Sequence, residues 1–380
     1  MKGRRFLTAV VGISLMLMLA VALPLLSACP APTTTEEVEQ LQADLAAANA
    51  TIADLEAQLA AVGVEPEVLE LRMQHSWGAA ENHFFEQYAD IVREMTGGQI
   101  DIAVFSDGEL VSWDELSDAV AAGTVDIGHT HPDYYEMVVP EGYLESAPYL
   151  WQTLDEEMAV IYEFGVGDLY AEALEEVYGY HVIGFQPDDY GALMFTKEIN
   201  SIADMEGCVI QLLDPYASIL AELAGSSATY LGPEEIYTSL ALGVLDGVEY
   251  GGAKAMGDMG FHEVAKYFVL PRHQQSWFPF YFINADTWDS LTADQQAILE
   301  QAVYANGIYM RAFYAEGEAS SLAMMVDAGV TVCYLPDEDV EAIFQKTLEW
   351  LEEDYAAMSP RCAEITERVF EALRVFGRID

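Results

Sequence analysis

Imidazoles and large aromatic rings gather where strands of the chain are expected to end, and these side chains could bind a small molecule. His129 and His131 lie two residues apart, so on an extended segment both imidazoles point to one side and could share a metal ion. No third ligand is evident in the sequence, and such pairs also arise by chance. Trp77, Tyr134 and Trp277 could each stack on a ligand, although each could equally be a core aromatic.

Motifs of the common catalytic sites are not recognisable in the chain. The sequence has no GxSxG elbow, no Walker loop and no Cys/His pair with a plausible orienting group. Paired acids carry no information in a chain with 64 acidic residues. Cys208, Cys333 and Cys362 lie far apart without CxxC spacing, so either one disulfide plus one free thiol or three buried thiols would explain them. We therefore expect a binding protein rather than an enzyme.

The N-terminus predicts export. A positive segment with Lys2, Arg4 and Arg5 precedes an uncharged apolar run that ends in Leu26-Ser27-Ala28-Cys29. This ending resembles the lipobox of bacterial lipoproteins, in which the cysteine is lipidated and becomes the new N-terminus. The resemblance implies a signal peptide over residues 1–28 and a lipid on Cys29, with the remaining chain tethered outside the cytoplasmic membrane. An uncleaved anchor helix or a plain cleaved signal are the alternatives.

A heptad seam follows the export signal. Residues 30–35 are rich in Pro and Thr, which is typical of a loose linker. Apolar residues then alternate steps of three and four over residues 38–62, the spacing of a coiled coil of roughly 40 Å. We expect residues 29–66 to form a lipid-anchored stalk that could join copies of the chain into a homo-oligomer. A single amphipathic helix packed on the globular part is the alternative.

The charge of the chain excludes one class of partner. The sequence carries 15 basic and 64 acidic residues, a net charge of −49, and removal of the three basic residues of the signal leaves 12 − 64 = −52. Nucleic-acid binding needs a basic surface, so no nucleic-acid partner is expected. A saline habitat or a cationic partner or ligand would each explain the charge. The content of 52% hydrophobic residues is sufficient for a large core.

The rest of the chain alternates strands and helices, the pattern of an α/β fold with mainly parallel sheets. Residues 67–380 exceed one small core, so we expect two lobes, one of about 67–190 and 283–325 and the other of about 191–282 and 326–380. Ligands then bind at the carboxyl ends of strands, in a cleft between the lobes. The expected elements are strands Val68–Gln74, Ile100–Phe105, Val125–Gly128, Tyr180–Phe185 and Cys208–Leu212, and helices Glu81–Met95, Trp113–Ala122, Tyr216–Leu223, Glu234–Leu242 and Ala293–Met325, the last long enough to cross between lobes.

Four segments resemble one known family in order and spacing. They are Ser106–Leu110, Asp118–Gly128, Thr196–Gly207 and Glu234–Glu249. They are similar to motifs of the substrate-binding proteins of tripartite ATP-independent periplasmic (TRAP) transporters, the DctP family. The resemblance implies a two-lobe periplasmic binding protein fold with hinge strands and a long spanning helix. It also implies that the lobes close on a solute without ATP or chemistry, and that the solute passes to a membrane permease.

A further segment, residues 260–267, is similar to family members that bind 2-oxo or 2-hydroxy acids, often with a metal ion beside the carboxylate. In those members an Arg follows the third motif, where this chain has Gln211, and a Gln or Arg lies 21 residues earlier, at Tyr190. An acid follows the Asp-Gly pair, which is Glu249 here, with Tyr250 next to it. Gln275 stands where a later acid is common. The resemblance thus implies ligand contacts at the first four positions, and a Ca²⁺ or Na⁺ ion held by Glu249 and Gln275.

The missing Arg changes the chemistry that the resemblance implies. A guanidinium grips a carboxylate with two charge-assisted hydrogen bonds, which Gln and Tyr cannot replace. Either another cation takes over, with Lys254 and Arg272 the nearest candidates, or the ligand is not a simple carboxylate. We expect a TRAP-type protein for a small organic acid, bound with a metal ion. The alternatives are a neutral or cationic solute, and a ligand sensor for a membrane receptor.

Overall fold

The computed structural model describes residues 40, 43, 46–47, 50–51 and 68–380, and the chain divides into two units, residues 1–67 and 68–380. The six described residues of the first unit are helical and exposed. The predicted signal peptide, Cys29, the linker and most of the heptad seam lie outside the described residues and stay predictions. Among the helices of the described part, none combines the length and the apolar character that crossing a membrane requires.

The first sheet of the second unit has five strands in the order β2-β1-β3-β10-β4. These are β1 (Leu69–His75), β2 (Ile100–Phe105), β3 (Ile127–Thr130), β4 (His181–Phe185) and β10 (Phe280–Ile283). β1 runs parallel to β2 and β3, whereas β10 is antiparallel to both β3 and β4. The carboxyl ends of β1 and β3 therefore meet at one edge of the sheet.

The second sheet has six strands in the order β11-β9-β5-β8-β6-β7. These are β5 (Gly191–Phe195), β6 (Val209–Gln211), β7 (Ser227–Thr229), β8 (Gly247–Gly251), β9 (Tyr267–Gln274) and β11 (Thr331–Tyr334). β5 is antiparallel to β8 and β9, and the other pairs are parallel.

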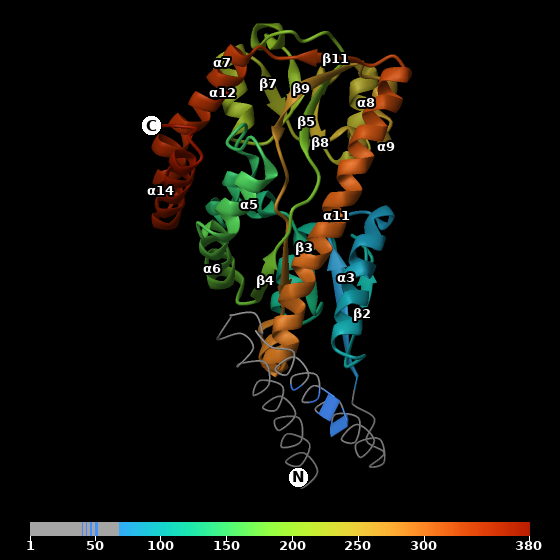
Figure 1. Cartoon of the computed structure of the whole chain (residues 1–380). Coiled ribbons are helices and arrows are strands. Elements are labelled where there is room, and N and C mark those ends of the chain that lie inside the picture. The colour runs from blue at the N-terminus through green and yellow to red at the C-terminus, as the bar shows by residue number, and fades with distance from the viewer. Residues whose placement is uncertain (1–39, 41–42, 44–45, 48–49, 52–67) are drawn as a thin grey trace. The chain divides into compact units, whose positions relative to one another are not determined.

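Both sheets are mixed, whereas the sequence predicted mainly parallel ones. The reason is the path of the chain between the sheets (Figure 1). It leaves the first sheet through β4 and enters the second through β5, then returns from β9 to β10. Because outgoing and returning strands lie side by side, each sheet acquires antiparallel pairs at the crossing.

Helices cover both faces of each sheet. They are α3 (Asn82–Met95), α4 (Leu116–Ala121), α5 (Leu154–Tyr162), α6 (Val166–Tyr178), α7 (Tyr216–Ala224), α8 (Pro233–Leu242), α9 (Ala253–Asp258), α10 (Ala285–Ser290), α11 (Ala293–Asp327), α12 (Asp337–Trp350), α13 (Ala356–Met358) and α14 (Pro360–Val375). Short 3-10 turns include η1 (Ala79–Glu81), η2 (Trp113–Glu115), η3 (Pro132–Tyr135), η4 (Pro140–Ser146), η5 (Ile202–Met205) and η6 (Phe261–Glu263), and a π-helical turn, η7 (Leu351–Tyr355), joins α12 to α13.

α11 contains 35 residues and contacts strand β4 and helices α3 and α9. It begins at a capping box, in which the Thr292 hydroxyl accepts from the Gln295 amide and the Gln295 side chain accepts from the Thr292 amide. It packs on α3 and β4 beside the first sheet and on α9 beside the second (Figure 1). Its position ties the two sheets together near the crossing strands.

Strand alternation assigns residues to separate apolar clusters on the two faces of the second sheet. Leu193 packs toward α7 and α12, whereas its neighbours Ala192 and Met194 pack toward α8 and α9. Cys208, Cys333 and Cys362 are free and buried, which confirms the alternative of three buried thiols. The core is thus apolar on both sides of each sheet, and polar groups gather at the sheet edges.

Candidate functional site

The carboxyl edge of the first sheet holds a tryptophan and a histidine in contact. His75 of β1 pairs with His129 of β3, so the residues that follow these two strands are neighbours. The Trp77 indole N–H donates to Nε2 of His131 over 3.1 Å. Since an indole nitrogen can only donate, this contact requires an Nε2 without a proton.

The buried carboxylate of Glu145 contacts several groups at this edge. Its side chain is 5% exposed, and Oε1 lies 3.3 Å from Nδ1 of His131. The same oxygen accepts from the Phe278 amide over 2.8 Å, and Oε2 accepts from the Asp133 amide over 3.2 Å. Glu145 therefore connects η4 to the end of β3 and to the segment that returns to β10.

Asp133 is a second buried acid beside Glu145. The residue is 7% exposed, and Ser146 donates to Oδ2 over 3.3 Å, but Oδ1 has no hydrogen-bond partner among the described residues. Burial and then the charge of Glu145 raise its pKa well above the usual range, and Glu249 of the second sheet adds to the rise. The charge of Glu249 thus reaches Asp133 from the second sheet.

Two more titratable groups at this edge respond to the same charges. Burial raises the pKa of Asp188, which lies 3.8 Å from Nε2 of His131, to about 6. Burial opposes a charged His131, but the hydrogen bond and charge of Glu145 outweigh it and raise the pKa of the imidazole to about 9. A doubly protonated ring offers Trp77 no acceptor, so the Trp77 contact holds only in the neutral ring.

Glu249 is the acid that the second sheet contributes. It lies in β8, and its side chain is 12% exposed with Oε1 3.3 Å from Nε2 of His273. No group in the described part of the chain makes a hydrogen bond to this oxygen. A buried carboxylate oxygen that accepts no hydrogen bond can be satisfied by a cation.

Gln211 and Tyr250 leave the second sheet on the other face. Gln211 pairs with Val248, one residue before Glu249, and so points away from the Glu249 side by strand alternation. It is buried, and its side-chain oxygen accepts from the Leu231 amide over 3.3 Å. Tyr250 packs edge-on against Phe261. The structure thus does not bring Gln211 and Glu249 together on one face.

Tyr190 lies at the crossing between the sheets. The guanidinium carbons of Arg272 and Arg311 lie 4.4 and 3.9 Å from the centre of its ring. Its neighbour Gly191 faces the opposite way, because a Cβ there would lie 2.9 Å from Nε2 of His273 and 3.0 Å from the Trp277 ring. The Tyr190 ring therefore contacts α11 and β9 rather than the Glu249 face.

The predicted aromatic rings are distributed over the cleft. Tyr134 is half-buried, and burial followed by the charge of Asp133 raises its pKa well above the usual range, with smaller contributions from Tyr230 and Tyr250 across the cleft. Trp277 is half-buried and lies 6.4 Å from the His273 ring. Gln275 is half-buried, two residues before Trp277.

His129 is part of the core rather than of the cleft. Its ring is buried between Trp77, Phe85 and Tyr281, at centre distances of 5.1, 4.6 and 4.7 Å. Because Trp77 contacts the rings of both His129 and His131, the two imidazoles do not face a common open space.

The cations that the sequence offered as replacements for the missing Arg are engaged elsewhere. Lys254 pairs with Asp258 on α9, and Arg272 pairs with Glu318 of α11 over 2.7 Å. Within residues 68–380, the cleft acids Asp133 and Glu249 have ion-pair contact with no Lys or Arg side chain. The cleft is therefore anionic, with imidazoles as its nearest basic groups.

Sequence reasoning missed four cleft groups: Asp133, Glu145, Asp188 and His273. Asp133 lies two residues after His131, and Asp188 lies three residues after the end of β4, so position after a strand was the available signal. It could not distinguish these residues among 64 acids. Glu145 and His273 had no local signal.

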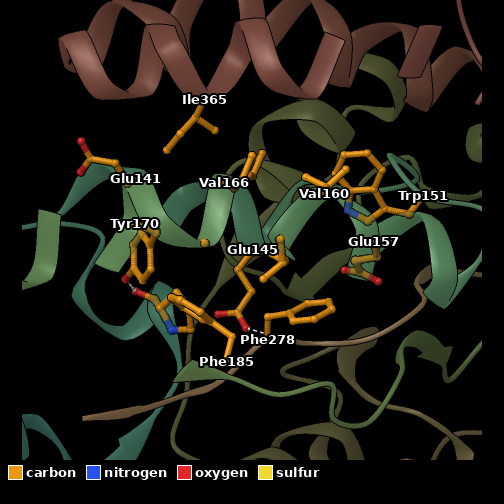
Figure 2. A pocket seen from close by; sticks show the side chains of 15 residues that line it. Glu141, Glu145, Trp151, Glu157, Val160, Val166, Tyr170, Phe185, Phe278 and Ile365 are labelled. Atoms are coloured by element: carbon orange, nitrogen blue, oxygen red, sulfur yellow. Dashed lines mark hydrogen bonds between the residues drawn. The ribbon is translucent and has the colours of Figure 1, made fainter. Parts of the chain in front are cut away.

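A separate cavity lies behind this edge of the first sheet (Figure 2). It measures about 50 Å³, and Figure 2 shows Glu145 directed to the Phe278 backbone with Ile365 of α14 on the far side. Glu157 also lines it, with Oε2 unbonded within the described chain and a pKa raised by burial. This volume has room for a few water molecules. Because most of the lining is apolar, the cavity lacks the polar groups that would orient a solute.

Comparison with known proteins gives the family and the fold. The sequence profile of the bacterial extracellular solute-binding proteins, family 7 (DctP), matches residues 73–357. A relative in Nostoc sp., a monocarboxylate 2-oxoacid-binding periplasmic protein, is 28% identical over 294 residues, 74% of this chain and 78% of its own.

Two solved structures of TRAP transporter solute-binding proteins show the same fold. The one from Colwellia psychrerythraea, with bound calcium and pyruvate, has a TM-score of 0.74 and 25% identity and covers 82% of this chain and 96% of its own. The one from Bordetella bronchiseptica, with calcium and picolinate, has a TM-score of 0.67 and 24% identity over 82% of this chain and 95% of its own.

Proposed function

Because the chain belongs to the bacterial extracellular solute-binding proteins, family 7, the DctP family of TRAP transporter components, we propose that it captures a small organic acid together with a metal ion and delivers it to a membrane permease. Proteins of this family are extracytoplasmic, non-enzymatic components of transport. The finer steps, which are the acid, the metal and the delivery, are the proposal.

The charge of the cleft supports a metal ion. A carboxylate ligand would enter beside Glu249 and Asp133, and like charges in a desolvated site repel one another. Because Arg272 is engaged with Glu318, an Arg clamp of the kind expected from the resemblance is missing on this face. A divalent ion between Glu249 and the ligand would remove the repulsion and replace the guanidinium.

The observation that carries the proposal is the buried Oε1 of Glu249, which lies 3.3 Å from Nε2 of His273 but accepts no hydrogen bond within the described chain. A 2-oxo or 2-hydroxy acid can offer a carboxylate oxygen and its neighbouring oxygen to the same ion, and Gln275 could add an amide oxygen. Trp77, Tyr134 and Trp277 would cover the carbon skeleton from the first sheet and the crossing segment. Tyr190, Gln211 and Tyr250 lie at the margin of this arrangement and would contribute through lobe closure.

A thermal-shift screen tests the proposal. The purified protein is stripped with a chelator and then mixed with pyruvate and other 2-oxo or 2-hydroxy acids, with and without Ca²⁺. A ligand at 100 times its Kd stabilises the folded state by about 2.7 kcal/mol, so Tm should rise only when acid and metal are both present. Glu249→Gln should abolish the rise, and the exposed control Glu70→Gln should leave it unchanged. Stabilisation by amines or polyols without metal would contradict the proposal.

We also propose that Cys29 carries a lipid and that residues 38–62 pair copies of the chain. Cys29→Ala should move the protein from the membrane fraction to the soluble extracytoplasmic fraction. Deletion of residues 38–62 should reduce the mass of the particle in solution to that of one chain. An unchanged distribution or an unchanged mass would contradict the respective proposal.

A further inference from the structure

We propose that His131, Asp133 and Glu145 form a second cation site, on the first-sheet side of the cleft, that takes a divalent transition-metal ion such as Zn²⁺ or Mn²⁺. This site goes beyond the proposed function, because it does not include Glu249 and does not require a ligand acid.

The three side chains have the spacing of a metal site. One nitrogen or oxygen atom from each of them lies within 4.8 Å of the other two. Around a tetrahedral zinc ion with ligand bonds near 2.1 Å, ligand atoms stand about 3.4 Å apart. His131 Nδ1 and Glu145 Oε1 are already 3.3 Å apart, so only the Asp133 carboxylate has to move inward.

Asp133 provides an independent sign of a missing partner. Its Oδ1 is buried and has no hydrogen-bond partner in the part of the chain that the structure describes. Its other oxygen, Oδ2, accepts from the Ser146 hydroxyl, so rotating the carboxylate group would give one oxygen a partner only by taking it from the other. A buried carboxylate oxygen without a partner is costly, and a cation between Asp133 and Glu145 would remove both this cost and the repulsion of the two acids.

The hydrogen bonds of Glu145 do not block the site. Its oxygens accept from the amides of Phe278 and Asp133, yet a carboxylate offers about four lone-pair positions. The hydrogen bonds from these two backbone N–H groups hold the carboxylate in place, as hydrogen bonds to metal-binding side chains commonly do. Glu145 can thus bind an ion without leaving its structural position.

Metal binding would change the Trp77 contact. An ion on Nδ1 of His131 leaves the proton on Nε2, 3.8 Å from the Asp188 carboxylate. This excludes the contact in which the Trp77 indole N–H donates to a proton-free Nε2. Because the Trp77 and His131 rings are in contact, an ion bound to His131 changes the environment of the indole, which therefore reports on occupation of the site.

The ligand set selects the type of ion. Calcium takes six to eight oxygen ligands, whereas one imidazole with two carboxylates suits zinc or manganese. The inference is therefore distinguishable from the calcium ion of the proposed function by the choice of metal.

Calorimetric titration of the chelator-treated, tag-free protein with Zn²⁺ tests the site. Asp133→Asn keeps the shape of the side chain and removes its charge, and it should lower the Zn²⁺ affinity by more than the 10- to 100-fold that loss of a second-shell partner costs. Two matched controls, Glu136→Gln three residues away and Glu249→Gln across the cleft, should retain this binding. Zn²⁺ should also change the tryptophan fluorescence of the wild type, and this change should disappear in Trp77→Phe while the heat of binding persists.

Loss of Zn²⁺ binding in Glu249→Gln with full retention in Asp133→Asn would overturn the inference, since the ion would then lie at Glu249 and His273. Absence of binding in the wild type would overturn it as well. If Asp133→Asn does not fold, Mn²⁺-loaded Glu249→Gln is measured by electron paramagnetic resonance. Coupling to an imidazole nitrogen is expected there, and its absence would contradict the site. If Zn²⁺ does not bind at His131, Asp133 and Glu145, the calcium-dependent binding of acids at Glu249 is unaffected and is tested separately by the thermal-shift screen.

Discussion

The two sides of the crossing between the sheets differ in how their acids are paired with Arg side chains. On the α11 side, Arg272 and Arg311 lie over the ring of Tyr190, and Glu318 is bonded to Arg272. On the cleft side, Asp133 and Glu249 have no such partner among residues 68–380. A chain with 15 basic residues thus uses two of them at its hinge. Under the proposed function, the cation at Glu249 comes from solution, because Arg272 and Arg311 are engaged on the α11 side.

The largest effect is expected at the hinge ion pair. Glu318 is 4% and Arg272 24% exposed, and Oε1 of Glu318 accepts from the guanidinium over 2.7 and 2.8 Å. Glu318→Gln keeps an acceptor oxygen but leaves this guanidinium without a charged partner, which should lower the free energy of unfolding by about 2–4 kcal/mol. Denaturant unfolding measures the loss. The matched surface variant Asp258→Asn, which removes the exposed partner of Lys254, should cost less than about 0.5 kcal/mol. Equal losses would refute the contrast between the two pairs.

The second prediction adds a positively charged side chain at residue 211 and asks whether acid binding then still needs calcium. Gln211→Arg restores the side chain that the family resemblance implies at this position. A charge-assisted pair with a ligand carboxylate contributes about 1.5–3 kcal/mol, so affinity for the acid without calcium should rise roughly 10- to 100-fold. Calorimetry in the presence of chelator measures it. An affinity that still depends fully on calcium would show that residue 211 stays against the Leu231 amide and outside the site.

Two substitutions at Tyr190 distinguish a stabilising role of its ring from a contact of its hydroxyl with the ligand. Tyr190→Leu removes the ring beneath both guanidinium groups and should lower the free energy of unfolding by about 1–2 kcal/mol. Tyr190→Phe keeps the ring and should change stability by less than about 0.5 kcal/mol. Both variants are followed by thermal unfolding and by acid binding. A marked loss of binding in Tyr190→Phe alone would instead assign the hydroxyl to the ligand.

The smallest effect concerns pH at the rim of the cleft. Burial and the charge of Asp214 raise the pKa of Glu136 from about 4.5 to about 8. The folded state therefore holds a proton that the unfolded chain releases, and the stability this provides is complete below about pH 4.5 and is lost as the pH rises to 8. Glu136→Gln keeps the neutral form and should stabilise the protein by about 1 kcal/mol at pH 8, which is well below the full shift because the side chain is partly exposed.

Denaturant unfolding at pH 5 and pH 8 tests this expectation. The slope between the two values should be shallower in Glu136→Gln than in the wild type, whereas the exposed control Glu70→Gln should keep the wild-type slope. An unchanged slope in Glu136→Gln would show that the carboxyl is charged in the folded state, because a group ionised in both states adds no pH dependence.

Elements with a clear apolar face were predictable from local pattern. The strand at Ile100–Phe105 matches its predicted bounds, and the predicted helix at Glu81–Met95 differs from α3 by one residue. Helices α5 and α6 and the crossing strands β5 and β10 were not predicted. β5 and β10 are buried on both faces, and a short apolar run of this kind has no period that distinguishes a strand from a buried helix.

The candidate site shows the same division. Glu249 and Trp77 were predicted at the ligand and stay predictions, and Tyr190 was predicted there too, whereas its ring lies against Arg272 and Arg311. The register of β5 decides this, since Gly191 faces His273 and Tyr190 consequently faces α11. A shift of one residue exchanges the two faces of a strand, and with both faces buried the sequence cannot reveal which is which.

By itself, the sequence determined the family, the alternation of strands and helices, and the excess of acids. Their local signals need only neighbours within a few residues. Only the tertiary structure decided which acids meet. Asp133, Glu145 and Glu249 come from segments up to 116 residues apart (249 − 133), and they share one cleft because two sheets place their strand ends opposite one another. The same packing moved Arg272 and Arg311 to the hinge, so the charge of the site depends on long-range contacts rather than on composition.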